Sequence, residues 1–356
     1  MTTADSGDAS APKGRRFTIL PQTKRGWIRF SLLLALPLGS MLVLYNLMIA
    51  MPLSSYRDPL PALDATTRET QTRLEADVVA LCTTAGGRNQ LDMPGLRVAE
   101  QFLTTSFAAA GLPPQYHEYE CRGTTVRNIE AELLGTVRPA EIIVIGAHYD
   151  AYTGTSADDN ASGTAAVLEL ARVFAGTPQP RTIRFLAFVN EEPPFFQQPG
   201  AMGSEVYAGR CKERDEKIVA MLSLEMLGYY STEPNSQQYP WPLKWLYPST
   251  GDFVAFVGSY SNRRLVRQCI RAFREKTQFP SEGAALPSNI PGVEYSDHWA
   301  FSYHGYSAAM VTDTAFFRNN NYHTLHDTPD TLDYERMARV VVGLRDVVRD
   351  LAHVEP

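Results

Sequence analysis

Acidic and imidazole side chains follow several apolar runs of this 356-residue sequence, at points where a buried strand would end. His148 and Asp150 follow the run 141–147, and because they are two residues apart on an extended chain, they project to the same face. Such a carboxylate can hold the second ring nitrogen of the histidine and raise its basicity toward a metal ion. Asp158 and Asp159 follow in a polar loop that leads into a helix, where ordinary helix capping is the alternative explanation.

Three further segments place acidic or imidazole side chains after an apolar run. They are Glu191-Glu192 after 185–189, Glu225 after 219–224, and the loop 322–328 with Tyr322, His323 and His326. Each segment alone has an ordinary explanation, such as a solvated glutamate or a hydrogen-bonded histidine. Four successive elements with the same kind of ending favour a metal centre, because carboxylates gathered at buried strand ends are costly without a cation. Carboxylates and imidazoles without thiolates suit Zn, Mn or Co.

The elements that position these residues alternate between strand and helix. Apolar runs and helical periodicity predict strands over 125–134, 141–147, 182–189, 218–224, 253–257 and 308–311, and helices over 65–80, 96–110, 162–174, 262–276 and 334–351. This alternation predicts an α/β sandwich with a largely parallel sheet. In such sheets ligand sites form beyond the carboxyl ends of the strands, which is where the acidic residues stand.

One segment has no clear place in this alternation. Residues 228–250 are rich in tyrosine, tryptophan and proline, and they either form an aromatic wall of a substrate pocket or pack on themselves as a surface loop.

A long uncharged segment stands near the start of the sequence. No charged residue occurs between Arg29 and Arg57, and 30–52 is almost continuously apolar. A helix of that length reaches about 35 Å, which is enough for a hydrocarbon core of roughly 30 Å. The cations precede the segment, so the positive-inside rule places the N-terminus in the cytoplasm and the rest in the periplasm or outside the cell. A cleaved signal peptide is the alternative.

The predicted span divides the chain into a basic cytoplasmic tail over 1–26, a transmembrane signal anchor over 27–52, a tether over 53–62 and a folded domain over 63–356. Residues 1–29 carry a net charge of +4, and since the whole chain carries −6, the remainder carries −10. An acidic body argues against a nucleic-acid partner. Export makes four cysteines, Cys82, Cys121, Cys211 and Cys269, possible disulfide partners, with buried free thiols as the alternative.

The motifs together resemble a known family. His148-x-Asp150, Asp158-Asp159-Asn160-x-Ser162-Gly163, Glu191-Glu192, Glu225-Met226-x-Gly228, and Tyr322-His323 with Asp327-Thr328 occur in the order and approximate spacing of the secreted co-catalytic zinc aminopeptidases. That family includes glutaminyl cyclases and glutamate carboxypeptidases. The resemblance covers roughly residues 70–350 and implies a mixed eight-stranded sheet flanked by helices.

The resemblance also implies roles for individual residues. Two zinc ions would share Asp159, one of them also bound by His148 and Glu225 and the other by Glu192 and His323. Asp150 would orient His148, Glu191 would be the general base, and Tyr322 would help to bind the oxyanion. The segment Ser296-Asp297-His298 resembles a family segment near the pocket, where it would line the pocket or support the ligands. The run Pro193-Pro194-Phe195-Phe196 after the paired glutamates departs from the family pattern and would reshape the pocket.

A member of this family would be an exopeptidase that hydrolyses N-terminal residues of peptides with a metal-bridged hydroxide. A glutaminyl-peptide cyclotransferase on the same scaffold is one alternative, and a non-catalytic binding module is the other. The sequence keeps a suitable residue type at every implied ligand position and at Glu191, which favours an enzyme.

Overall fold

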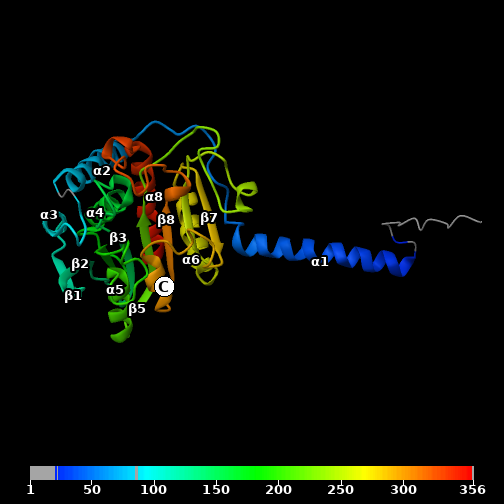
Figure 1. Cartoon of the computed structure of the whole chain (residues 1–356), viewed down its shortest axis with the longest axis horizontal. Helices are drawn as coiled ribbons and strands as arrows, with labels where there is room; N and C mark the ends of the chain where they lie inside the picture. Colours follow the sequence, from blue (N-terminus) through cyan, green and yellow to red (C-terminus); the bar gives the residue numbers. More distant parts are fainter. Residues whose placement is uncertain (1–20, 22, 85–86, 355–356) are drawn as a thin grey trace, which may run out of the picture. The chain divides into compact units, whose positions relative to one another are not determined.

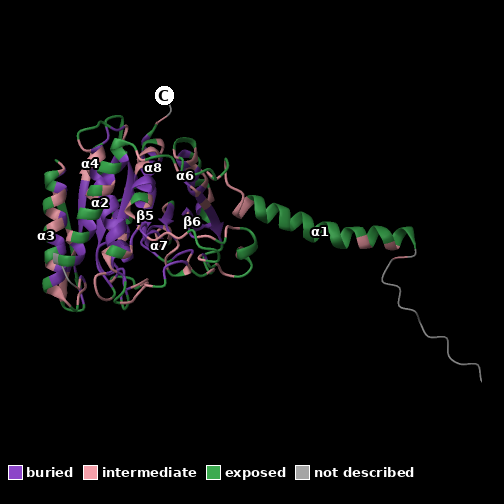
Figure 2. Cartoon of the chain, turned by 90° about the horizontal axis from the view of Figure 1, so that it is seen from above, coloured by how far each residue is buried: buried purple, intermediate pink, exposed green. Residues whose placement is uncertain are grey.

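The computed structural model describes residues 21, 23–84 and 87–354, and the chain forms two units, residues 1–46 and 47–356. The first unit contains most of helix α1 (Lys24–Met48), which has no buried side chain, as Figure 2 shows. By length and composition α1 is able to cross a membrane, and a signal sequence near an N-terminus passes the same test.

The second unit is built on one mixed sheet of eight strands in the order β1-β2-β4-β3-β5-β8-β6-β7 (Figure 1). The strands are β1 (Pro114–Cys121), β2 (Thr124–Leu133), β3 (Arg138–His148), β4 (Arg181–Phe188), β5 (Lys217–Glu225), β6 (Val254–Ser259), β7 (Ser281–Leu286) and β8 (Ala308–Thr312). The neighbours β4, β3, β5 and β8 are parallel to one another, and β6 is parallel to β7 but antiparallel to β8. The carboxyl ends of four adjacent strands therefore meet at one edge of the sheet.

Helices cover both faces of this sheet. One layer contains α2 (Ala65–Thr84), α3 (Met93–Ala109), α4 (Gly163–Phe174), α6 (Arg263–Lys276) and α8 (Tyr334–Ala352), and the other contains α5 (Gly203–Glu213) and α7 (His298–Tyr303). Short turns of helix are η1 (Ala157–Ser162), η2 (Leu243–Trp245), η3 (Tyr260–Asn262), η4 (Ala315–Phe317) and η5 (Pro329–Thr331). Along β3, Ile143 and Ile145 enter the core under the first layer, and Ile142 and Val144 enter the core under the second. A strand buried on both faces is continuously apolar, which explains its clear signal in the sequence.

The predicted α/β sandwich with a largely parallel sheet is confirmed, and so is the mixed eight-stranded sheet flanked by helices that the resemblance implied. The sequence interpretation missed two strands, β1 and β7, and two helices, α5 and α7. β1 is an edge strand with polar residues such as His117 and Glu118, and β7 contains the small residues Gly283, Ala284 and Ala285, so neither shows an apolar run.

All four cysteines are buried and free. The structure thus shows the second alternative, buried thiols, and no disulfide. Burial raises the pKa of Cys82 to about 11 and that of Cys211 to about 12. Such thiols stay protonated at neutral pH, and protonated thiols are poor nucleophiles.

Gly163, the first residue of α4, packs against the end of β5. A Cβ atom at this position would collide with the backbone oxygen of Leu224 and with the side chain of Asn160. We expect Gly163→Ala to lower the free energy of unfolding by about 1–3 kcal/mol, because a backbone group must move to make room. Thermal unfolding followed by circular dichroism measures the change.

Gly209→Ala in α5 is the matched control. Its Cβ would meet only ring atoms of His304, at 3.3 and 3.4 Å, and alanine favours a helix, so the melting temperature should not fall. Equal melting temperatures for the two variants would contradict the packing argument.

Candidate metal centre

The parallel strands bring the predicted site residues to one edge of the sheet. His148 is the last residue of β3 and Glu225 is the last residue of β5, while Glu191-Glu192 follow β4. Asp159 lies in η1, immediately before α4, and His323 lies in the loop after β8. This is the edge at which parallel α/β sheets form ligand sites.

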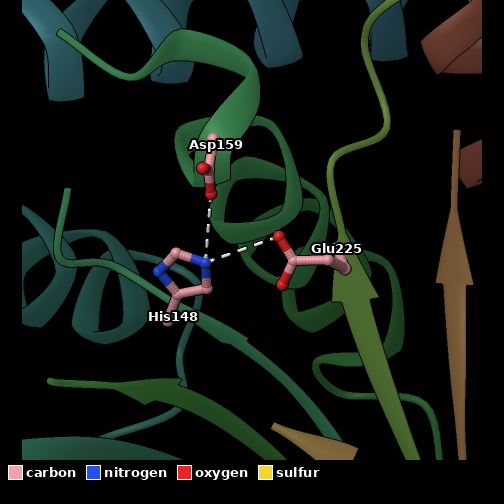
Figure 3. Close-up of side chains that lie close together, drawn as sticks. All are labelled: His148, Asp159 and Glu225. Atoms are coloured by element: carbon pink, nitrogen blue, oxygen red, sulfur yellow. Dashed lines mark ion pairs between the residues drawn. The ribbon is translucent and has the colours of Figure 1, made fainter. Parts of the chain in front are cut away.

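Two groups of three side chains each could hold one metal ion, and within a group all ligand atoms lie within 4.8 Å of one another. In the first group, drawn in Figure 3, His148 Nε2 lies 3.4 Å from Asp159 Oδ1 and 3.5 Å from Glu225 Oε1. In the second group, His323 Nε2 lies 3.1 Å from both Asp159 Oδ2 and Glu192 Oε2. Asp159 belongs to both groups and contributes a different oxygen to each.

The second group contains three buried polar atoms without a hydrogen-bond partner in the described part of the chain, namely Asp159 Oδ2, Glu192 Oε1 and His323 Nε2. Such atoms are costly to bury and are usually satisfied by a ligand, an ion or a water. The donors are imidazole nitrogens and carboxylate oxygens, which zinc accepts in a tetrahedral arrangement. These residues therefore fit a divalent ion of the zinc type.

Burial controls the charge of this cluster. It raises the pKa of Glu192 to about 8, with a further contribution from the nearby charge of Asp159, and it raises the pKa of Glu191 well above its ordinary value. Burial alone would lower the pKa of His323, but the carboxylates of Asp159 and Glu192 outweigh it and raise that pKa to about 10. Without a cation the cluster holds extra protons at neutral pH, and a divalent ion would displace them.

Asp150 fixes the loop that carries the paired glutamates. Its Oδ1 accepts a hydrogen bond from the backbone N–H of Glu191, and its Oδ2 accepts one from that of Glu192, each at 3.1 Å. Its carboxylate also lies 3.5 Å from His148 Nδ1, while the backbone oxygen of Asp150 lies closer to that nitrogen, at 3.2 Å. The contact of Asp150 with His148 was predicted from the sequence, but its hydrogen bonds with the backbone of Glu191 and Glu192 were not.

Glu191 lies beside the two groups and belongs to neither. Its Oε2 is 3.9 Å from His148 Nε2, and its side chain is buried but reaches the cavity described below. A carboxylate next to a metal position, with a raised pKa and access to a cavity, has the properties that proton transfer requires.

Aromatic rings flank His323. The ring of Tyr322 stacks on the imidazole with centroids 3.8 Å apart, and the ring of Tyr152 stacks on it with centroids 4.2 Å apart. Sequence reasoning did not single out Tyr152, because nothing local relates it to a histidine far along the chain. His326, the other imidazole of this loop, is exposed and is not in either group.

Two further side chains support the predicted ligands. Asp327 accepts hydrogen bonds from the backbone N–H groups of Asp158 and Asp159, at 2.9 and 3.0 Å. Ser296 Oγ donates a hydrogen bond of 2.6 Å to Glu225 Oε2, which is the supporting contact expected of its segment. In the sequence Asp327 is only part of a motif, and nothing near it indicates its hydrogen bonds to η1.

A cavity of about 280 Å³ adjoins the cluster. Asp159, Glu191, Glu192, Glu225 and His323 form one side of it, and the other walls are mostly apolar. These walls include Pro193 and Phe196, Tyr239, Pro240, Leu243 and Tyr247 from 228–250, Ala284 and Leu286 from β7, and Ile290, Val293, Phe316 and Phe317. Residues 228–250 and the run 193–196, both expected to shape a pocket, therefore contribute to this cavity.

Comparison with known proteins places the chain in a family. The model for peptidase family M28 matches residues 128–348, and the chain belongs to this family. It is 37% identical over 301 residues to an uncharacterized protein, YfbL, of Escherichia coli strain K12, covering 81% of this chain and 91% of that one.

Solved structures share the fold. The Legionella pneumophila LapA aminopeptidase has a TM-score of 0.65 at 19% identity and covers 84% of this chain and 78% of its own. The glutaminyl cyclase of Fimbriiglobus ruber has a TM-score of 0.59 at 22% identity and covers 85% of this chain and 99% of its own. The match to peptidase family M28 confirms the predicted family membership, and these solved structures show that the fold is shared.

The metal-free chain should lose stability as the pH rises from about 6 to 9. The folded pKa values of Glu192 and His323, about 8 and about 10, lie above their unfolded values. In this range the folded state therefore binds more protons than the unfolded state, and the stability that these groups contribute at low pH disappears as the pH rises through the folded values. The melting temperature after chelation, measured across this range, tests the sign.

Zinc should raise the melting temperature most at the high end of this range, because an ion stabilises the ionised carboxylates. Glu192→Gln removes one titrating group and should make the metal-free chain less sensitive to pH. A metal-free melting temperature that increases with pH would show that the cluster is not protonated as described.

Proposed function

We propose that this chain is a zinc-dependent aminopeptidase that removes N-terminal residues from peptides outside the cytoplasm. The observation that carries the proposal is the carboxylate of Asp159, which lies in two ligand groups with Glu191 beside them. Membership of peptidase family M28 supports it. One zinc ion would be held by His148, Asp159 and Glu225, and a second by Asp159, Glu192 and His323.

Bound zinc would supply Lewis acidity, which polarises a peptide carbonyl and makes water a better nucleophile at neutral pH. Glu191 would accept a proton from the attacking water and then deliver it to the departing amine, a role that its raised pKa supports. The backbone hydrogen bonds to Asp150 would hold Glu191 and Glu192 in place through these steps. The hydroxyl of Tyr322 would donate to the carbonyl oxygen as it gains negative charge.

The cavity supports a substrate class. Its apolar walls suit a bulky apolar side chain on the first residue of the peptide, and the carboxylates along one side suit the positive charge of a free α-amine. A blocked N-terminus would place an uncharged group, and additional chain, beside those carboxylates. We therefore propose unblocked peptides that begin with a residue such as leucine or phenylalanine.

Two other functions remain candidates. A glutaminyl-peptide cyclotransferase is favoured by the fold that the chain shares with the Fimbriiglobus ruber glutaminyl cyclase over 99% of that protein. A non-catalytic binding module is the other, and the presence of suitable residues at both ligand groups and at Glu191 argues against it.

We also propose that residues 27–52 anchor the chain in a membrane, with the N-terminus in the cytoplasm and the enzyme in the periplasm or outside the cell. The length and apolar composition of α1 support this arrangement, as do the cations that precede it.

A substrate panel tests the activity. The purified full chain should cleave leucyl and phenylalanyl p-nitroanilides, should cleave aspartyl and lysyl substrates more slowly, and should not cleave N-acetylated ones. Chelation should abolish cleavage and zinc should restore it. Ammonia release from a glutaminyl peptide without aminoacyl cleavage would support the cyclotransferase, and turnover of no substrate by the zinc-loaded chain would support the binding module.

Glu191→Gln tests the assigned proton transfer. We expect kcat to fall by about 10²- to 10⁴-fold, the usual contribution of a general base. The zinc content per chain should not change, because Glu191 lies in neither ligand group. The control is Glu213→Gln, which alters an exposed glutamate at the end of α5 and should keep the wild-type kcat. Normal turnover in Glu191→Gln would overturn the assignment.

A further inference from the structure

An exposed aromatic patch lies on the segment 240–246, which we call the Trp loop. The side chains of Trp241 and Trp245 are 75% and 66% exposed, and their rings meet edge to face with centroids 5.9 Å apart. Leu246 is 47% exposed, and the exposed Lys244 places its Nζ 5.2 Å from the Trp245 ring. Large apolar side chains gathered on a surface usually mark a contact with a partner.

The two sides of the Trp loop have different surroundings. Leu243 and Pro240 line the cavity of the proposed active site, as do the flanking Tyr239 and Tyr247. Tyr247 also donates a hydrogen bond of 2.7 Å to the backbone oxygen of Gly283 in β7, which fastens the loop to the edge of the sheet. The tryptophans are therefore not needed to fill the core, and their exposure is compatible with a fixed loop.

The chain that leaves α1 packs against the same place. Met48 and Ile49, which belong to the second unit, lie in one apolar cluster with Leu243 and Tyr247 around the buried Leu286. The cluster joins the inner side of the Trp loop to the last residues of the long apolar segment.

The next residues are held by two arginines of α6. Arg267 of α6 donates a hydrogen bond to the backbone oxygen of Ala50, and Arg274 donates to those of Pro52 and Leu53, at 3.1 and 2.9 Å. If residues 27–52 span a bilayer, residues 48–53 lie at the boundary between hydrocarbon and water by chain connectivity alone. Side chains that pack on Met48 then also lie near the boundary between hydrocarbon and water.

We propose that the Trp loop is a second membrane contact, which inserts Trp241 and Trp245 into the headgroup region of the bilayer crossed by the apolar segment. Tryptophan is enriched at this depth because its ring is apolar and its N–H is polar, and a lysine beside it can extend its charge to the lipid phosphates. The proposal rests on the proposed membrane span and not on the peptidase activity. It places one wall of the cavity beside the bilayer surface.

Tryptophan fluorescence tests the contact. The chain contains four tryptophans, so Trp27→Phe with Trp299→Phe leaves only the pair in the Trp loop. The full chain with these changes is reconstituted in vesicles of phosphatidylcholine and phosphatidylglycerol, with or without lipids brominated near the headgroup end of the acyl chains. We expect loss of emission with brominated lipid and protection from aqueous iodide.

The matched control moves the reporter to another exposed site. Leu134 is 64% exposed in the turn between β2 and β3, away from β7 in the strand order. In a chain with all four tryptophans changed to Phe, Leu134→Trp should be quenched by iodide and not by brominated lipid.

If Trp299→Phe prevents folding, Trp299 is kept, and the difference between chains with and without Trp241→Phe/Trp245→Phe gives the signal of the Trp loop.

Vesicle flotation and leucyl-p-nitroanilide cleavage, measured on the same sample, separate the possible outcomes. A chain that floats with vesicles and shows quenching by brominated lipid supports the proposal. A chain that floats but loses no emission with brominated lipid overturns the proposal. Emission that instead depends on protein concentration assigns the patch to a contact with a second copy of this chain, which also overturns it. A chain that does not float overturns both the span and the Trp-loop contact, while its peptidase activity is judged independently by the cleavage assay.

Discussion

Repulsion among buried carboxylates is the constraint on which this structure depends. Glu191 and Glu192 follow β4, Glu225 ends β5, and these glutamates meet Asp159 from η1 in surroundings where burial opposes their ionisation. Such a cluster is stable only if protons or cations neutralise part of its charge. The atoms of Asp159, Glu192 and His323 that have no hydrogen-bond partner within the described ranges are the ones that a divalent ion would satisfy. The proposed zinc ions and the peptidase family both agree with this requirement.

Much of the surrounding structure holds these groups in place. Asp150 binds the backbone of both glutamates after β4, Asp327 binds the backbone of η1, and Ser296 binds Glu225 at the end of β5. The parallel strands set the spacing of these elements, and the two helical layers bury the strands on both faces. The cluster is thus placed by strands and helices, whereas much of the cavity wall comes from loops and from the β7 edge. Such a division lets side-chain preference change without moving the chemistry.

Features that show within a short stretch of the sequence could be predicted, and contacts between distant residues could not. β3, β4 and β5 are buried on both faces, so their apolar runs were visible, and the acidic residues that end them pointed to the site. β1 and β7 lack such runs and were missed. Contacts between distant residues left no local signal: Asp327 lies 169 positions from Asp158, and Ser296 lies 71 positions from Glu225. For residues 228–250 the sequence left a pocket wall and a surface loop as alternatives. The structure shows that some side chains of this segment line the cavity and that others are exposed on the surface.

The position of Asp159 in two ligand groups has a thermodynamic consequence. Its Oδ1 faces His148 and its Oδ2 faces His323, so no rotation of this carboxylate can improve one group without altering the other. Two ions held in this way would not load independently. The first would order the shared side chain and also remove negative charge from the site of the second, and by linkage each would change the affinity of the other by the same factor.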